Sequence, residues 1–236
     1  MISWPPGPPT NRAGPEQPGF RIAMAGELRN DTSGVIGYPP EPWQLRGQMH
    51  LTAWRVPAAC LPRISAGLEP VRARGTALVV TAWAIYEPGG VLSYRELLVA
   101  VLAHRGKRPL ATITDIWVDN VPSLRGGREL WGIPKQWASF HLDGATCDAV
   151  DADGAPIASA ALRPLGVLPG RWRGGCTVAQ QRAGELILIP VRATSGVRLI
   201  RISWEFAADG PLGWLVGARP IFSMSLRDFT VRFGRP

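Results

Sequence analysis

Short apolar segments separated by turn-forming residues follow one another along most of the chain. The most strongly apolar segment, residues 76–86, has consecutive apolar positions and predicts a strand that is buried on both faces. Asp153-Gly154 predicts a hairpin between residues 147–150 and 157–162. Segment 91–103 fits a strand or a helix, and the neighbouring strands favour a strand. Further strands are expected at residues 48–56, 110–118, 138–142, 146–151, 185–192, 196–206 and 220–233.

Few segments have helical character. Residues 58–67 predict a short helix interrupted by Pro62, and residues 122–130 predict a helix weakened by Gly126-Gly127. The prolines and glycines of residues 164–175 predict a loop. Many short strands with few helices, and no internal repeat, predict an antiparallel barrel or a two-sheet sandwich.

The length of 236 residues favours one large domain, which we place at residues 38–236. Residues 1–37 are rich in proline and glycine and have no hydrophobic period, so we expect a flexible arm, one that can contact a neighbouring subunit. The longest apolar run is too short to cross a bilayer, and the N-terminus lacks a secretory pattern. We therefore expect a cytoplasmic protein without membrane contact.

The charge of the chain raises nucleic-acid binding as a hypothesis. The net charge is +8 and the pI is near 10.4. The arginines are spread along the whole chain without a basic run of five, so we expect no nucleic-acid partner. The same positive field serves an anionic small substrate. The three cysteines and three histidines are scattered, so neither a disulfide framework nor a metal site is predicted, and no cofactor is expected.

One lysine stands out in the sequence WGIPKQWASF, residues 131–140. Lys107 and Lys135 are the only lysines among the 26 basic residues, and Lys135 lies between tryptophans. An amine can lose its proton, whereas a guanidinium cannot. Desolvation disfavours an ammonium ion and frees the amine as a nucleophile. The alternative is a lysine whose stem packs on tryptophan while its head reaches water.

Residues 118–135, VDNVPSLRGGRELWGIPK, resemble the acetoacetate decarboxylase family. That family has an Asp-Asn pair, a Gly-Arg-Glu sequence and a Pro-Lys pair that holds the Schiff-base lysine. Ser93-Tyr94-Arg95-Glu96 is similar to the family's Tyr-x-Glu segment, whose glutamate lies in the active site. The matching positions are Asp119-Asn120, Gly127-Arg128-Glu129 and Pro134-Lys135, and upstream Pro42-Trp43-Gln44-Leu45.

The resemblance covers most of the chain from Tyr38 onward. It implies a mainly β fold with a few short helices, a closed, cone-shaped antiparallel β-barrel with the active site inside. It also implies a homo-oligomer, and a lysine, here Lys135, that condenses with a substrate carbonyl.

Three positions depart from the family pattern. Gln136 stands where family decarboxylases have a second lysine. By register, Gln48 replaces an arginine that faces the substrate carboxylate, and Thr81 replaces a second glutamate. Lys135 and Glu96 remain as the expected catalytic pair. The residues expected to bind substrate are Gln136, Gln48, Tyr94, Trp131 and Thr81.

The retained groups predict a lysine-imine lyase of the decarboxylase or aldolase-dehydratase type. An iminium ion on Lys135 accepts electrons from a departing bond, and Glu96 moves protons. The amides at Gln48 and Gln136 bind a carboxylate less well than a guanidinium does. We therefore expect aldol, dehydration or cyclisation chemistry on a small keto acid or other carbonyl compound, suited to secondary metabolism, more than authentic acetoacetate decarboxylation. The alternatives are a non-catalytic barrel that binds an apolar or acidic small molecule, and for Glu96 a partner of a nearby arginine.

Overall fold

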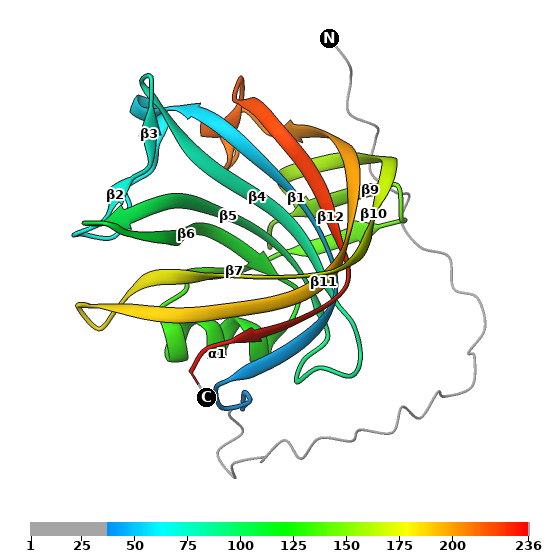
Figure 1. Ribbon diagram of the computed structural model, residues 1–236, viewed down its shortest axis with the longest axis horizontal. Helices are drawn as coiled ribbons and strands as arrows, with labels where there is room; N and C mark the ends of the chain where they lie inside the picture. Colours follow the sequence, from blue (N-terminus) through cyan, green and yellow to red (C-terminus); the bar gives the residue numbers. More distant parts are fainter. Residues whose placement is uncertain (1–36, 236) are drawn as a thin grey trace.

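A computed structural model describes residues 37–235 of the chain (Figure 1). The predicted arm at residues 1–37 therefore lies outside the described residues except for Gly37. The described part contains one α-helix, two short 3-10 helices and twelve strands. In chain order the elements are β1 (Trp43–Pro57), η1 (Ala58–Cys60), β2 (Glu69–Pro70), β3 (Arg72–Ala73), β4 (Thr76–Tyr86), β5 (Tyr94–Arg105), β6 (Arg108–Val118), α1 (Val121–Trp131), β7 (Lys135–Trp137), β8 (Ser139–Leu142), β9 (Thr146–Val150), β10 (Pro156–Arg182), β11 (Glu185–Phe206), η2 (Gly213–Leu215) and β12 (Arg219–Phe233).

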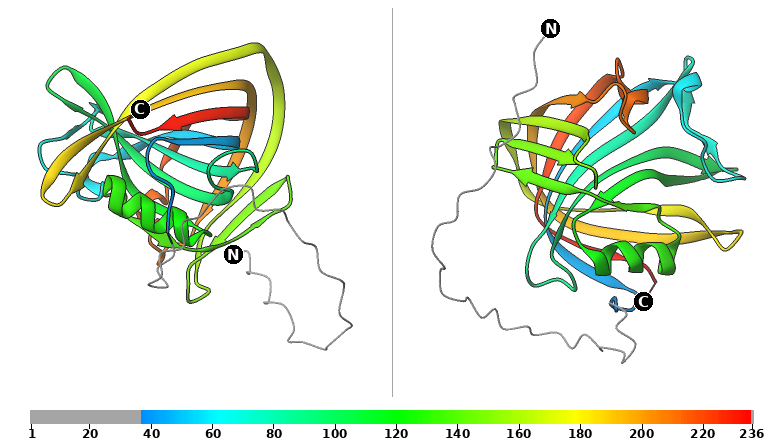
Figure 2. Two further views of the ribbon diagram at one scale, coloured as in Figure 1. Left: turned by 90° about the horizontal axis from the view of Figure 1, so that it is seen from below. Right: turned by 180° about the vertical axis from the view of Figure 1, so that it is seen from behind.

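The strands form one curved sheet with the order β7-β6-β5-β4-β1-β12-β11-β10-β9-β8. An additional pairing of β10 with β6, at Val178 and Ala111, joins distant members of this path into a closed ring. The curvature and the single helix beside the sheet are visible in Figures 1 and 2. The predicted mainly β fold is confirmed. The pairings of β6 with β7 and with β10 are parallel, so the sheet is not wholly antiparallel.

Several predicted strands are confirmed, among them β4 with the predicted bounds and the strand interpretation of residues 91–103 as β5. The Asp153-Gly154 hairpin is also confirmed, because β9 and β10 pair antiparallel across it. The predicted helix at residues 58–67 is wrong beyond the 3-10 turn Ala58–Cys60, since Pro62 lacks the N–H that a helix needs.

The predicted loop at residues 164–175 is wrong. These residues belong to the long strand β10, which pairs with β11 on both sides of irregularities at Pro164/Gly166 and Leu168/Trp172. Strands accept proline and glycine at such bulges, where a ladder hydrogen bond is already missing. The two strands expected at residues 185–192 and 196–206 are likewise one strand, β11.

Apolar side chains gather in two main clusters on opposite faces of the curved sheet. Along β4, Trp83 packs in one cluster with Trp54 of β1, whereas Tyr86 packs in the other with Trp43 and Tyr94. Adjacent strand residues point to opposite faces, so an odd separation between Trp83 and Tyr86 places them on different sides. Glu96, which is paired with Ala84 on the same face as Tyr86, is consequently buried among the side chains of the second cluster.

Candidate active site

The helix α1 and the turn after it direct Lys135 toward the sheet. Asn120 caps the helix, with its side-chain oxygen accepting a hydrogen bond from the Ser123 backbone N–H at 2.8 Å. Gly132 ends the helix with φ of +62°, a conformation that favours glycine. Lys135 then begins β7, paired in parallel with Ile116 of β6. The chain reversal thus brings Lys135 back beneath the first turns of α1.

The Lys135 amine is buried, with 3% of the residue exposed. Its Nζ donates to Glu96 Oε2 at 2.8 Å and to Ser123 Oγ at 2.8 Å, and lies 3.4 Å from the Tyr94 hydroxyl. An ammonium group has three protons, and these three oxygens are partners for all of them. The amine is therefore fully hydrogen-bonded within the described residues.

Glu96 is the centre of the hydrogen-bond network. It is 4% exposed, and while Oε2 accepts from Lys135, Oε1 accepts from the Tyr86 hydroxyl at 3.1 Å. Burial, and next the charge of Glu96, raises the pKa of Tyr86 and of Tyr94 well above the ordinary value. Both phenols therefore remain protonated hydrogen-bond donors near neutral pH.

Aromatic rings enclose the amine on its remaining sides. Nζ lies 5.0 Å from the centroid of the Tyr94 ring and 5.8 Å from that of Trp43. Ring faces carry partial negative charge and attract a cation at these distances. The site can therefore hold an ammonium ion, and it excludes water from the amine when the proton has left.

The Gly-Arg pair at residues 127–128 positions Lys135. A Cβ atom added at Gly127 would lie 2.7 Å from Lys135 Cδ, so only glycine allows the helix this close to the lysine chain. Arg128 Nε donates a hydrogen bond of 2.6 Å to the Lys135 carbonyl oxygen. Glu129 accepts from the Tyr38 hydroxyl at 2.7 Å. Gly127 thus makes room for the Lys135 side chain and Arg128 holds its carbonyl group, whereas the contact of Glu129 is with Tyr38.

Three of the predicted site residues come together, namely Lys135, Glu96 and Tyr94. Trp131 lies nearby, buried, with its Nε1 donating to Glu41 Oε2 at 2.8 Å, and its ring packs on Trp43. Trp131 thus packs against Trp43, whose ring lies near the Lys135 amine.

The remaining three predicted residues lie away from the amine. Gln136 is exposed beside Lys135 on β7. Gln48 is exposed on β1 and donates to Glu87 Oε1 at 3.1 Å. Thr81 is buried on the face of β4 opposite to Tyr86, where it accepts from Trp54 Nε1 at 2.9 Å. The structure thus does not place Gln48 or Thr81 with the catalytic candidates.

Sequence reasoning missed Ser123, Tyr86 and Trp43, all of which contact the pair or its carboxylate. Ser123 is the third residue of a capped helix, a position where serine commonly serves the helix itself. Tyr86 lies at the end of an apolar strand, where the sequence predicts a residue of the hydrophobic core. Strand alternation could have suggested Tyr86. Tyr94 and Glu96 are two residues apart on β5 and so share one face of the sheet, and Tyr86 is the cross-strand partner of Tyr94.

A pocket of about 550 Å³ is lined by Arg128, Gly132, Ile133, Pro134 and Gln136, next to Lys135 in the chain. Another, of about 580 Å³, lies over β1, β12, β11 and β10. Lys135 lines neither pocket, so in this conformation its amine faces protein groups.

No helix in the described part of the chain has the length and apolar character needed to span a membrane. Among residues 37–235 no group of three or more histidine, cysteine, aspartate or glutamate side chains is arranged to hold a metal ion.

The chain belongs to the acetoacetate decarboxylase family, since the family model for acetoacetate decarboxylase matches residues 28–171, more than half of the sequence. This match contains Glu96, Ser123 and Lys135. No curated protein sequence gives a significant match.

Solved structures share the fold at low sequence identity. An acetoacetate decarboxylase from Legionella pneumophila has a TM-score of 0.60 and 14% identity, over 88% of this chain and 91% of that one. An acetoacetate decarboxylase-like enzyme from Sphingomonas wittichii has a TM-score of 0.59 and 16% identity, over 89% and 98% of the two chains. The enduracididine biosynthesis enzyme MppR, in complex with pyruvate, has a TM-score of 0.58 and 20% identity, over 86% and 90%. These likenesses confirm the predicted fold.

Proposed function

We propose that this protein is a Schiff-base-forming lyase in which Lys135 is the nucleophile and Glu96 the general acid and base. The observation that carries the proposal is the buried Lys135 amine, 2.8 Å from Glu96 in a site enclosed by tyrosine and tryptophan. Family membership supports an enzyme of this kind. A lysine that only packs its stem on apolar side chains reaches water with its head group, whereas the Lys135 amine is buried.

The first step is a proton transfer from Nζ to Glu96 Oε2 along the hydrogen bond that joins them. The resulting neutral amine attacks the carbonyl carbon of the substrate, and protonated Glu96 donates to the carbonyl oxygen. The carbinolamine then loses water to give the iminium ion. Tyr86, which donates to Glu96 Oε1, stabilises the carboxylate whenever it carries charge.

The iminium ion next loses an α-proton to Glu96 and becomes an enamine. This carbon nucleophile can add to an aldehyde, and loss of water from the adduct gives an unsaturated product. Hydrolysis of the imine returns the free lysine. MppR has been solved with pyruvate and with the condensation product of pyruvate and imidazole 4-carboxaldehyde, and such a reaction fits the same sequence of steps.

The groups around the amine favour this chemistry over decarboxylation of acetoacetate. Within residues 37–235 the hydrogen-bond partners of Nζ are one carboxylate and two hydroxyls. None of these partners is a guanidinium or a second ammonium group, which are the groups that bind the carboxylate of a β-keto acid well. Among its hydrogen-bond partners in the described part of the chain, the amine therefore has no cation that would hold the carboxylate of acetoacetate while CO2 departs. We therefore infer a small keto acid or other carbonyl substrate, with aldol, dehydration or cyclisation as the reaction.

Substrate must displace one partner of the amine, because Nζ faces protein groups in this conformation. Tyr94, at 3.4 Å, has the longest contact and is the weakest of the three. The pocket of about 550 Å³ is lined by Pro134 and Gln136, the residues on either side of Lys135 in the chain. We expect substrate to approach through that pocket with a local shift of α1.

Reductive trapping tests the proposal. Incubation with pyruvate or acetoacetate and borohydride should add the mass of one substrate less one oxygen atom to the wild-type protein, because imine formation releases water and borohydride adds two hydrogens, and the adduct should map to the peptide of Lys135. Lys135→Ala should lose the adduct. Lys107→Ala is the matched control, because Lys107 is the other lysine of the chain and is exposed, and it should keep the adduct.

The same buried ion pair favours a second candidate, a non-catalytic barrel that binds an apolar or acidic small molecule. A fully hydrogen-bonded lysine and glutamate can serve specificity of folding without chemistry. This candidate predicts no borohydride adduct with either ketone. It also predicts that Lys135→Arg keeps ligand affinity, whereas the lyase proposal predicts complete loss of imine formation in that variant.

A further inference from the structure

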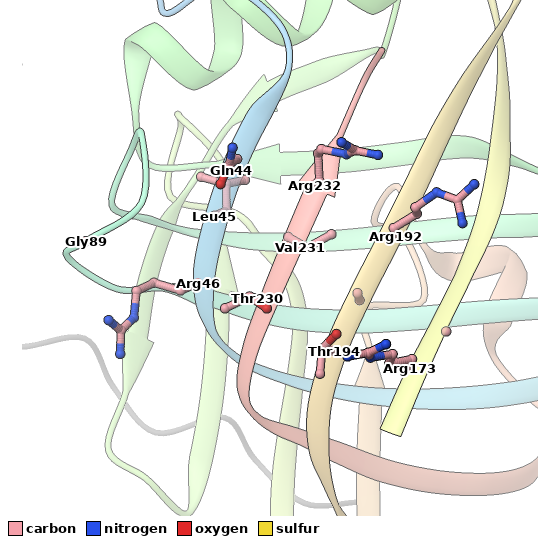
Figure 3. Close-up of a pocket in the computed structure, with 12 residues that line it drawn as sticks. Gln44, Leu45, Arg46, Gly89, Arg173, Arg192, Thr194, Thr230, Val231 and Arg232 are labelled. Atoms are coloured by element: carbon pink, nitrogen blue, oxygen red, sulfur yellow. The ribbon is translucent and has the colours of Figure 1, made fainter. Parts of the chain in front are cut away.

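A pocket of about 580 Å³ lies over four neighbouring strands, away from Lys135. Along β1, Gln44 and Arg46 alternate with Trp43 and Leu45, which belong to the buried cluster around Lys135. The alternating positions of β12 and β11 behave in the same way, so the pocket is on the opposite face of this part of the sheet. Figure 3 shows its side chains arising from the four strands.

Strand register arranges the polar side chains of this pocket, here named the arginine groove, in two rows. In the first row Gln44 is opposite Arg232, which is opposite Arg192. In the second row Arg46, Thr230, Thr194 and Arg173 follow one another across β1, β12, β11 and β10. With neighbouring strands about 4.8 Å apart, the second row spans roughly 14 Å. The two threonine hydroxyls lie between the outer arginines (Figure 3).

The arginine groove has unbalanced positive charge. No acidic side chain lines it. The salt bridges among residues 37–235 are Arg95–Asp119 and Lys135–Glu96, so the four groove arginines have no carboxylate partner in that part of the chain. Like charges directly opposite on neighbouring strands repel each other, and Arg192 and Arg232 are such a pair by register. An anion held between them would remove this repulsion.

We propose that the arginine groove binds a small molecule through a diphosphate or triphosphate group. Guanidinium forks match phosphate oxygens, and the hydroxyls of Thr194 and Thr230 add donors at the centre. One singly charged anion engages one arginine pair, whereas a chain of phosphates reaches both rows. No aromatic residue lines the groove, so recognition concerns the phosphates and not a stacked base. The proposal does not depend on imine chemistry at Lys135.

Calorimetric titration of the full chain with inorganic diphosphate, in 150 mM sodium chloride, tests the groove. We expect saturable binding of one diphosphate per chain, with inorganic triphosphate at least as tight and orthophosphate at least tenfold weaker. The variant Arg192→Ser/Arg232→Ser should weaken diphosphate binding at least tenfold. If that variant does not fold, Arg46→Ser/Arg173→Ser, which empties the other row, should show the same loss.

The matched control is Arg163→Ser/Arg201→Ser. These arginines also form an exposed cross-strand pair, between β10 and β11, and their removal changes the net charge equally without touching the groove. This control and Lys135→Ala should bind diphosphate within twofold of the wild type.

Four results would overturn the proposal. They are the absence of saturable diphosphate binding, equal weakening in the groove and control variants, loss of binding in Lys135→Ala alone, and binding of a duplex DNA that diphosphate does not compete. The last would identify the face as a nucleic-acid interface. Loss of imine trapping in Lys135→Ala with diphosphate binding intact would separate this site from the lyase proposal.

Discussion

At the scale of single residues, the protein depends on a charge pair that water does not reach. Lys135 and Glu96 side chains are each 4% exposed and 2.8 Å apart. A buried pair gains little net stability over apolar residues of similar size, but removing one partner leaves a charge without solvent or counterion. Removal of one partner should therefore lower the free energy of unfolding strongly, whereas replacement of both residues by apolar side chains should change it little.

A double-mutant cycle tests this reasoning. Lys135→Met should lower the free energy of unfolding by about 3 kcal/mol or more, because the Glu96 carboxylate loses its partner. Glu96→Leu should cost a similar amount. The double variant should cost clearly less than the two together. Urea unfolding at pH 7 measures all four proteins, and additive losses would contradict a coupled pair.

At the scale of elements, α1 is shaped by its contact with Lys135 and Trp43. Its two central glycines lower helix propensity, yet both face the sheet. Added Cβ atoms would lie 2.5 Å from Trp43 Cζ2 at Gly126 and 2.7 Å from Lys135 Cδ at Gly127. The helix thus gives up local stability for close approach, and its capping by Asn120 and Gly132 compensates at the ends.

Gly127→Ala separates these effects. In an open helix this change stabilises by about 1 kcal/mol, but here we expect a loss of about 1–3 kcal/mol because the methyl group displaces a lysine held by three hydrogen bonds. The rate of borohydride trapping should fall with it. Gly166→Ala, where nothing lies within 4 Å, is the control and should leave thermal unfolding and trapping unchanged. A Gly127→Ala variant more stable than the wild type would show that the helix is not in tight contact with the Lys135 side chain.

At the scale of the whole molecule, buried acids on both faces of the sheet make the fold sensitive to alkali. Burial, then the neighbouring Asp148 charge, raises the pKa of Cys147 from 9.0 to about 12. Burial also raises the pKa of Tyr86 and Tyr94. Each group holds its proton more tightly when folded than when unfolded, so the stability it contributes is complete below the unfolded pKa and is lost as pH rises toward the folded pKa.

Stability should therefore decrease between pH 9 and pH 12. Urea unfolding at pH 8 and pH 10.5 should show a loss of about 1–2 kcal/mol from Cys147, which Cys147→Ala should remove, with the tyrosines adding to the loss above pH 10. The exposed Cys60 provides the control Cys60→Ala, which should show the full loss. A flat profile for the wild type would contradict the burial argument.

Much of the site could be read from the chain because the chemistry concentrates in short motifs. Lys135 and Glu96 were identified by sequence and lie 2.8 Å apart in the structure. Gln48 and Thr81 were placed by counting register, and both lie elsewhere. A one-residue shift moves a strand residue to the other face, so counting across bulges and gaps carries no information on which face is reached.

The sequence predicted the positions of the strands better than it predicted their lengths. Alternation and turn residues located β4 and the hairpin at Asp153-Gly154, since both signals are local. Proline and glycine in residues 164–175 predicted a loop, but pairing with β11 carries β10 through that segment. A ladder of backbone hydrogen bonds to a neighbouring strand outweighs weak local propensity, and the neighbour is not visible locally.

The sequence by itself determined the mainly β class, the family and the one lysine that stands among apolar aromatic residues, because periodicity, composition and a contiguous motif are local properties of the chain. Only the tertiary structure decided that Ser123, Tyr86 and Trp43 surround that lysine pair, and that Arg46, Arg173, Arg192 and Arg232 share one groove. These groups come from strands and a helix far apart in sequence. Closure of the sheet sets their neighbours, and no local pattern encodes that closure.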